Sequence, residues 1–533
     1  MDLILDASGS FSWVRGPSAA PLLSIDGERL NPNSLGSQGT TSSATRDSDG
    51  DPETSEDLGV PLGPLTDGGP GLEIDPAAWA STQFHTAQLH DRRRTQRLVK
   101  LAAQIARDPS SSLPKQTQSW ADLKAAYRLL DRPEATFQVI AAPHWQLTKS
   151  QATTGRFLIV DDTTEIDFGP KRQAKGLGPV GTGSGRGFLL HSGLMVTPNE
   201  EWIVGLAGQV LFHRRPVPKG ETRTQRRARD RESAVWGQLI EQVGRPPEGA
   251  QWVHVMDRGA DDFEVHCRAR RMGADWVGRV KSPHRRVRDA AGQERTLSAL
   301  LADLPAAGGY CLALRARPNQ PARRAKIAVS FAEVTVLVPR QPAASLKALD
   351  PKPIPQWVVR AHELDPPPGL KEPIDWMLLT SLPVETLGGA MEVIGYYEKR
   401  WLIEEWHKAL KTGCRVEGRQ LQTSGGLEAL AGLLSVVAVR LMQLREMGRR
   451  QPARRAVELI PAAYVAMVHR ARRGRGRPED WTIRDFFRGL AGLGGSLGRK
   501  GDGEPGWITI WRGWDVLHAM LRGAQLAGQT TTL

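Results

Sequence analysis

The chain has 533 residues, enough for two to four domains with sizeable cores. Residues 1–75 contain thirteen Asp and Glu against three Arg, a balance of −10, so the remaining residues carry +13 − (−10) = +23. A body this basic favours a polyanionic partner, and the alternative is a basic protein without one. Three scattered cysteines exclude a disulfide framework or a zinc site and indicate a reducing compartment.

Neither a membrane span nor a signal peptide is expected. The longest strongly apolar run, 429–439, has eleven residues and is too short to cross a bilayer. The amino terminus lacks the basic start of a signal peptide. We therefore expect a cytoplasmic protein with no membrane partner.

The first two segments differ sharply in composition. Residues 1–75 are rich in Gly, Ser, Pro and Asp and are expected to form a disordered acidic tail. From 76 to 145 the pattern is helical, and the segment 91–101 brings Arg93, Arg97 and Lys100 together while Leu98 and Leu101 face a core. A second amphipathic helix is expected over 120–130. A helical domain with a basic face can read a DNA groove, although a solvated basic helix has the same pattern.

Two short apolar runs predict buried strands that end in acidic residues. Residues 157–160 lead into Asp161 and Asp162, and residues 252–256 lead into Asp257. Further strands are expected over 188–196 and 202–212, and a helix over 225–242. The glycines of 176–181 match a dinucleotide-binding pattern, but no strand precedes them, so a loop is expected there. From about 263 to 380 the chain alternates apolar and polar residues, which predicts a β-rich insertion.

The segment 397–411 is predicted to form one helix, because nothing in it breaks a helix. At about 100° per residue, one face carries a phenol, a guanidinium, a carboxylate and two ammonium groups, from Tyr397, Arg400, Glu404, Lys408 and Lys411. One interpretation is a solvated face held by i,i+4 ion pairs. The other is a phosphodiester site, with a carboxylate for a divalent metal and cations for phosphate.

The spacing Tyr-x2-Arg-x3-Glu-x6-Lys, seen here as Tyr397, Arg400, Glu404 and Lys411, resembles the signature of the DDE transposases of the insertion-sequence-four family. The resemblance runs from about residue 79 to 526. It includes Arg93, Arg94 and Arg97, which are similar to residues of the family's end-recognition domain. The acidic tail and the region around 472–480 depart from the family pattern.

Three carboxylates, Asp162, Asp257 and Glu404, are the candidate catalytic and metal-binding residues. Two strand-end acids and a helix acid can together bind two divalent cations. The resemblance selects Asp162, because the family pattern is Asp-Thr-Thr and Thr163 follows it, and it selects Asp257 from Asp-Arg-x-Ala-Asp. The nearest competing acids are Asp161, Asp261 and Glu405.

The resemblance also implies roles for Arg279 and Trp376. Members of that family use the corresponding arginine to hold terminal phosphate and the corresponding tryptophan to receive a base flipped from the transposon end. With Lys408 and the residues above, the expected DNA contacts are Tyr397, Arg400, Lys408, Lys411, Arg279, Trp376, Arg93, Arg94 and Arg97.

The expected fold is α/β: a ribonuclease-H-like, retroviral-integrase-like catalytic core over 146–445 with a β-rich insertion. A helical end-binding domain over 76–145 and a helical dimerisation domain over 446–533 flank it. The resemblance implies a Mg²⁺-dependent transposase, with Mn²⁺ as a substitute. It would cut double-stranded DNA at transposon ends, often through a hairpin, and join them to target DNA as a homodimer in a synaptic complex. The alternatives are a metal-dependent nuclease without strand transfer and a DNA-binding protein that has lost catalysis.

Overall fold

The computed structural model describes residues 2–5, 11–14 and 75–530, except 118, 200, 215–219, 221, 223–231, 315–320, 371 and 500–503. The chain divides into two compact units. The smaller unit comprises 1–71, 305–330 and 361–375, and all other residues belong to the larger unit. The boundary between the units falls within the two long strands β12 (Arg323–Val336) and β13 (Ile354–Leu364).

The smaller unit is built from strands. Two short strands, β1 (Asp2–Leu5) and β2 (Phe11–Val14), pair antiparallel within the segment expected to be disordered. The rest of that acidic tail lies outside the described residues, so its disorder stays a prediction. β11 (Gly308–Leu314) pairs with the first half of β12. The guanidinium of Arg323 forms an ion pair with the buried carboxylate of Glu363.

The larger unit begins with five helices, and the two that the sequence predicts are present. Side chains of Asp75, Asp91, Ser119 and Thr136 cap four of them by accepting hydrogen bonds from backbone N–H groups of the first turn. The helices are α1 (Pro76–Phe84), α2 (Arg92–Arg107), α3 (Leu113–Gln116), α4 (Trp120–Leu130) and α5 (Phe137–Ser150).

A mixed sheet forms the centre of the larger unit, with strand order β14-β8-β7-β3-β5-β4 and β6 beside β5. β3, β5 and β6 form an antiparallel meander, and β7 and β8 add to β3 in parallel. The strands are β3 (Gly155–Asp167), β4 (Gly178–Val180), β5 (Gly185–Val196), β6 (Ile203–Phe212), β7 (Ala250–Met256), β8 (Asp275–Arg279) and β14 (Asp375–Thr380). This is the mixed α/β architecture expected of a ribonuclease-H-like core.

Two helices pack on the central sheet and on each other, one against β5 and β6 and the next against β8. α7 (Ala234–Val243) covers part of the range predicted to be helical, and residues 225–231 lie outside the described residues. α8 (Phe263–Met272) connects β7 to β8. Because these two strands are parallel, a crossover connection such as this helix is required between them. The stretch expected to hold a β-rich insertion therefore opens with α8 and a strand of the central sheet, and further strands follow, among them the long β12 and β13.

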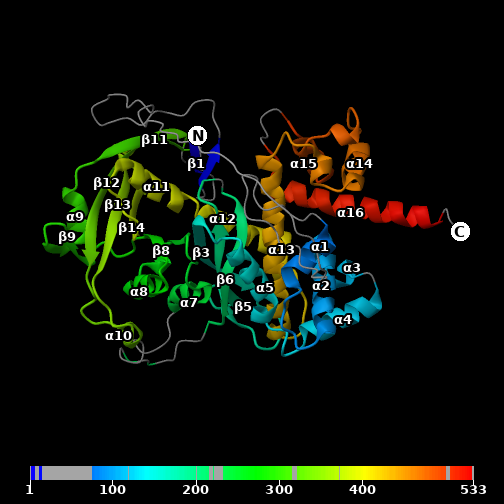
Figure 1. Ribbon diagram of the computed structural model, residues 1–533, viewed down its shortest axis with the longest axis horizontal. Coiled ribbons are helices and arrows are strands. Elements are labelled where there is room, and N and C mark those ends of the chain that lie inside the picture. The colour runs from blue at the N-terminus through cyan, green and yellow to red at the C-terminus, as the bar shows by residue number, and fades with distance from the viewer. Residues whose placement is uncertain are drawn as a thin grey trace, which may run out of the picture. The chain divides into compact units, whose positions relative to one another are not determined.

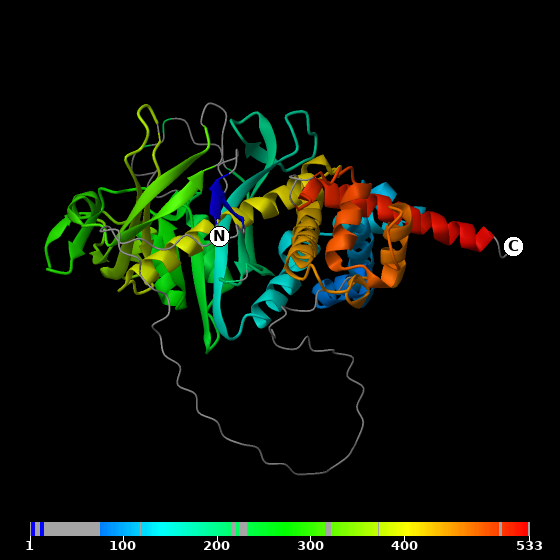
Figure 2. The same cartoon turned by 90° about the horizontal axis from the view of Figure 1, so that it is seen from above.

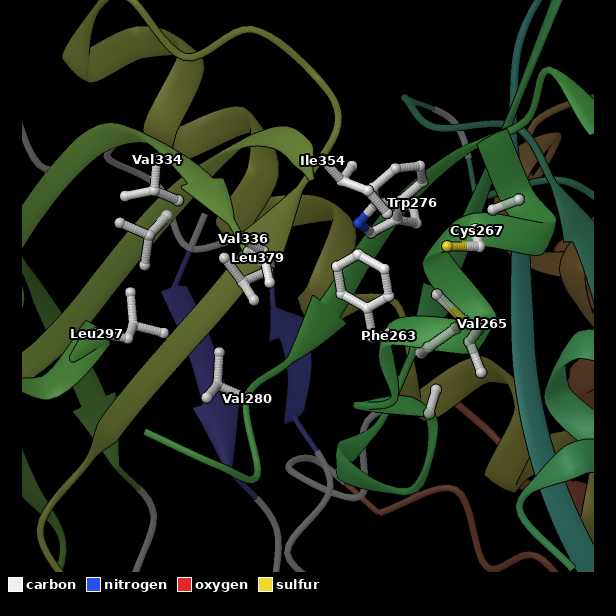
Figure 3. Close-up of a cluster of buried hydrophobic side chains, with 14 of the residues drawn as sticks. Phe263, Val265, Cys267, Trp276, Val280, Leu297, Val334, Val336, Ile354 and Leu379 are labelled. Carbon is white, nitrogen blue, oxygen red and sulfur yellow. The ribbon is translucent and has the colours of Figure 1, made fainter. Parts of the chain in front are cut away.

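An apolar core fixes this part of the larger unit, as Figure 3 shows. Phe263, Val265 and Cys267 from α8 face Trp276 of β8 and Ile354 of β13. Farther along the cluster, Val280 and Leu297 lie near Val334, Val336 and Leu379. The remaining elements here are β9 (Arg286–Asp289), β10 (Glu294–Thr296), α9 (Leu297–Asp303) and α10 (Ala344–Lys347).

The segment 397–411, predicted as one helix, is divided into three parts. α11 (Leu387–Glu398) ends at a turn, α12 (Trp401–Lys408) begins after Arg400, and a π-helical turn spans Ala409–Gly413. At the junction the backbone N–H groups of Lys399 and Arg400 bond carbonyls three residues earlier rather than four. The prediction of a single helix is therefore wrong, because tightened hydrogen bonds interrupt it without proline or glycine. Figure 2 shows α11 and α12 in yellow.

α13 (Ser424–Arg450) is the central helix of the larger unit, as predicted for 427–445. It packs against α4, α5 and β6, and Figure 1 shows it beside α5. By length and composition its stretch 424–448 could cross a bilayer, yet 89% of its most apolar window is buried inside the protein. That burial is typical of a core helix.

The carboxyl-terminal part is helical, as expected. α14 (Ala462–Ala471), α15 (Ile483–Leu493) and α16 (Trp507–Thr530) pack on one another and on the end of α13. Their core includes Phe486, Leu490, Trp514 and Leu517. A capping box at Thr482 and Asp485 fixes the start of α15. These helices appear in orange and red in Figure 2.

Candidate active site

Asp162 lies within β3 rather than at its end, which differs from the prediction. The strand continues to Asp167, because residues beyond the apolar run keep pairing with β5 as far as Gly187. In a strand, successive side chains point to opposite faces. The position of Asp162 is therefore set by its pairing with Ser192 of β5, while the pairing of β3 with β7 ends at Val160.

The parallel pairing of β3 with β7 brings the first two acids to one level. Val160 pairs with Val255, and Asp162 and Asp257 each follow their paired valine by two residues. Asp257 comes directly after β7, where its carboxylate caps a short 3₁₀ turn by accepting from the Gly259 N–H at 2.6 Å. The two carboxylates thus lie at matching positions, one within β3 and one directly after the adjacent strand β7.

Glu404 reaches the same place from α12, which packs against β3. The Arg400 guanidinium donates to the Glu404 carboxylate and lies 3.5 Å from Asp162 Oδ2. All three of these side chains are partly buried, with exposed fractions of 19–32%. Arg400 therefore joins the helix acid to the strand acid.

Charge and burial act together on Asp162. Burial raises the pKa of its carboxyl to about 7, and the negative charges of Asp257 and Glu404 add to that rise, while Arg400 opposes it. The charges of Asp257 and Glu404 are thus close enough to act on the Asp162 carboxyl, as is typical of carboxylates that converge on a shared site. The structure thus brings together the three acids that the sequence singled out.

The three competing acids have structural partners instead. Asp161 is fully buried, and its Oδ2 lies 2.7 Å from His254 Nδ1. Asp261 accepts from the backbone N–H groups of Lys281 and Ser282, and it pairs with Arg285. Glu405 pairs with Arg445 at 2.9 Å and Lys408 at 3.0 Å.

The donor set of the site fits a hard divalent cation. Asp162, Asp257 and Glu404 supply carboxylate oxygens, which Mg²⁺ and Mn²⁺ prefer, and a cation would relieve their mutual repulsion. Within the described part of the chain, no three His, Cys, Asp or Glu side chains already form a group that could hold a metal ion. Arg400 already forms ion pairs with Asp162 and Glu404. A metal ion held by these carboxylates would therefore have to displace the guanidinium.

Trp376 of β14 and Tyr397 of α11 pack against each other. Their rings meet edge to face with centroids 5.2 Å apart, and both side chains are buried. Trp376 is 7% exposed, so one face of its indole would have to open before a base could stack on it. Arg279 ends β8, where it pairs with Leu378 of β14. Arg279 and Trp376 therefore come from adjacent strands of the central sheet.

The cations expected to hold DNA point to different places. The Lys408 ammonium pairs with Glu405, and the Lys411 ammonium lies 3.4 Å from Glu417. Lys411 also lines a cleft of about 510 Å³ together with Arg415 and Arg512. Lys408 ends α12 and Lys411 lies in the π-helical turn, so the two cations do not share one helix as expected. Their contact with DNA stays a prediction.

The amino-terminal arginines lie on α2. Arg93 is exposed, Arg94 lies 3.4 Å from Glu134, and Arg97 donates to Asp122 at 2.8 Å. Lys100 also donates to Asp122, and this hydrogen bond is the main cause that lowers the pKa of the Asp122 carboxyl. Arg93 is thus the most open of the three expected end-binding residues.

Sequence reasoning missed Arg419, whose buried guanidinium joins distant parts of the larger unit. It donates to the carbonyl of Cys414 at 2.8 Å and to Gln116 Oε1 at 3.1 Å. It also donates to the carbonyls of Pro109 and Ser111, in the connection between α2 and α3. No local motif marks such a residue, because its partners other than Cys414 lie about 300 positions away.

Comparison with known families gives two matches. Residues 76–135 match the model described as transposase DNA-binding, and residues 218–440 match the model described as transposase DDE domain. The first covers α1 to α4, and the second includes Asp257 and Glu404. The two matches, together with the three converging acids, support a DNA transposase that carries a DNA-binding segment and a DDE catalytic domain.

Proposed function

We propose that the protein is a cut-and-paste transposase of the insertion-sequence-four type, acting in the bacterial cytoplasm on the ends of its own element. The observation that carries the proposal is the convergence of Asp162, Asp257 and Glu404, with every competing acid engaged elsewhere. Helices α1 to α4 would bind the element's ends, and a second copy of the chain would complete a synaptic complex.

The three acids would hold the divalent cations, with Mg²⁺ as the natural ion and Mn²⁺ as a substitute. When bound, such ions supply Lewis-acid stabilisation of the charge that develops on a phosphodiester. Arg400 forms ion pairs with Asp162 and Glu404 in the free protein, and we infer that it turns to the DNA phosphate once cations bind the acids. Tyr397, at the end of α11, would contact the same phosphate.

The proposed reaction has two stages, cleavage at the element's end and transfer of the free 3′ hydroxyl to target DNA. A hairpin on the element's end would require one base to leave the stack, at a cost of a few kcal/mol. Stacking on Trp376, worth about 1–3 kcal/mol, would offset much of it. A nuclease of the same fold would complete the first stage and lack the second.

The test uses purified protein, Mg²⁺ and a duplex carrying the inverted repeat that flanks the gene, with products resolved on a denaturing gel. Asp162→Asn, Asp257→Asn and Glu404→Gln should each abolish cleavage while end binding persists, because phosphate is held by cations rather than acids. The matched controls are Asp167→Asn, on the same strand as Asp162, and Glu405→Gln, next to Glu404. Both should cleave.

Near-normal cleavage by any one of the three acid variants would remove that residue from the site. Failure of the unaltered protein to cut its own end sequence in Mg²⁺ or Mn²⁺ would refute the catalytic proposal. Cutting without joining to a supercoiled target plasmid would leave the nuclease alternative.

A further inference from the structure

The connection between α14 and α15 is the most basic turn in the described carboxyl-terminal helices. Five exposed arginines lie within eight residues, 470–477, at positions Arg470, Arg472, Arg473, Arg475 and Arg477. We call this segment the arginine turn. It lies outside both family matches, which end at 135 and 440, and in the region whose sequence departs from the family pattern.

The backbone of the arginine turn is held in a defined shape. Trp481 donates its indole N–H to the Arg475 carbonyl at 3.3 Å, and its ring meets His469 edge to face at 4.8 Å. Gly474 lies so close to this pair that an added Cβ would come within 2.3 Å of the Trp481 ring. Arg473 adopts a left-handed conformation with φ of 50°. The backbone of the turn is therefore held by Trp481 and His469, and its arginine side chains are exposed.

Local acids do not neutralise the arginine turn. The nearest carboxylate in sequence that forms an ion pair, Asp480, lies 3.7 Å from Arg455, which also bonds the Glu479 carbonyl. By contrast, the neighbouring arginines of α15, Arg484 and Arg488, both pair with Glu504. Within the described residues, no carboxylate thus forms an ion pair with the arginines of the turn, whereas the two exposed arginines of α15 share Glu504.

We propose that the arginine turn binds the phosphate backbone of duplex DNA without reading its sequence, at a surface distinct from α1 to α4 and from the catalytic acids. Duplex DNA carries one charge per about 1.7 Å of its axis, so a compact array of guanidiniums can contact several phosphates at once. Guanidinium also matches phosphate in a bidentate geometry that lysine lacks. The inference rests on the proposed function and gives the protein a second hold on DNA, suited to flanking or target duplex.

The test compares two double variants that lose the same charge. Arg475→Gln with Arg477→Gln removes two arginines of the turn, and Arg484→Gln with Arg488→Gln removes two ion-paired arginines of α15. Arg472 is left in place because its guanidinium packs over Gly492. Binding of a fluorescent random-sequence duplex is measured by anisotropy across a series of KCl concentrations, and melting temperatures confirm folding.

The turn variant should lower the slope of log Kd against log salt by about 1.8, or about 0.9 for each lost phosphate contact. Its affinity near 0.1 M salt should fall by about tenfold or more, and the α15 variant should stay close to the unaltered protein. If the turn variant unfolds, Arg470→Gln with Arg473→Gln replaces it. An unchanged slope, or equal losses in both double variants, would overturn the inference.

Cleavage assays separate this inference from the proposed function. At saturating protein, the turn variant should still nick the element's end, because the catalytic acids are intact. If the unaltered protein cuts nothing while the turn variant still loses salt-dependent binding, the catalytic proposal fails and the DNA surface stands.

Discussion

Asp161 and Asp162 are consecutive residues of β3 whose carboxylates lie on opposite faces of the sheet. Asp161 is fully buried and bonded to His254, and Gly193 opposite it leaves room, since an added Cβ there would come within 2.9 Å of Asp161 Oδ1. Asp162 lies on the other face, 3.5 Å from Arg400. One acid supports the fold, and its neighbour belongs to the candidate active site.

Asp161→Ala should therefore destabilise the protein. It leaves the His254 ring without its partner at a fully buried position, which costs about 1–3 kcal/mol. Asp162→Ala removes a carboxylate that burial and two like charges disfavour, so its stability should be equal or higher while cleavage is lost. Urea unfolding of the two variants measures the contrast, and equal stabilities would show that the Asp161 contact contributes little.

Replacing Trp376 should slow hairpin formation more than the first nick at the element's end. Because the indole is buried against Tyr397, Trp376→Ala should also cost about 3–5 kcal/mol of stability. Trp376→Phe keeps much of the packing and serves as the milder variant. If the proposed hairpin forms, nicked product should accumulate on a denaturing gel in both variants. Equal slowing of nick and hairpin would instead mark an ordinary core tryptophan.

Gly413→Ala should disturb the end of the catalytic helix. A Cβ at this position would come within 1.5 Å of the Trp511 ring, so α16 or the π-helical turn must shift. We expect a lower melting temperature and weaker cleavage. Gly425→Ala, in the first turn of α13 with open space around it, is the matched control and should be close to neutral. Equal melting temperatures in the two variants would contradict the close packing.

Glu398 should make stability fall as pH rises. Burial raises the pKa of its carboxyl from 4.5 to about 8, Glu201 adds to the rise, and Lys399 opposes it. Between these pH values the folded state holds a proton that the unfolded state has released, so stability declines by up to about 1.4 kcal/mol per pH unit. Glu398→Gln should flatten the dependence of the melting temperature between pH 5 and 8, and an unchanged slope would point to another group.

Much of the site could be predicted from local patterns. The apolar runs before Asp162 and Asp257 indicate buried strands, whereas the parallel register that aligns the two acids is seen only in the structure. The choice of Asp162 over Asp161 depends on the Thr-Thr that follows it, because the apolar run alone favours neither. The structure supports that choice through strand alternation, which places only Asp161 in the core.

Two features were not accessible from the sequence for physical reasons. The turn at Lys399 and Arg400 contains neither proline nor glycine, so the division of the predicted helix depends on tertiary packing rather than propensity. The strand β3 extends past its apolar run because β5 supplies hydrogen bonds to polar residues as well. Both cases involve partners that a local pattern does not contain.

The buried Arg419 has a consequence for modularity. Its guanidinium needs acceptors from Pro109, Ser111 and Gln116 as well as from Cys414 near the catalytic helix. A catalytic fragment made without the first 135 residues would leave that charge in the interior with most of its acceptors gone. The DNA-binding segment is therefore not an interchangeable cassette. A chimaera that swaps its end specificity must carry the loop between α2 and α3 as part of the recipient.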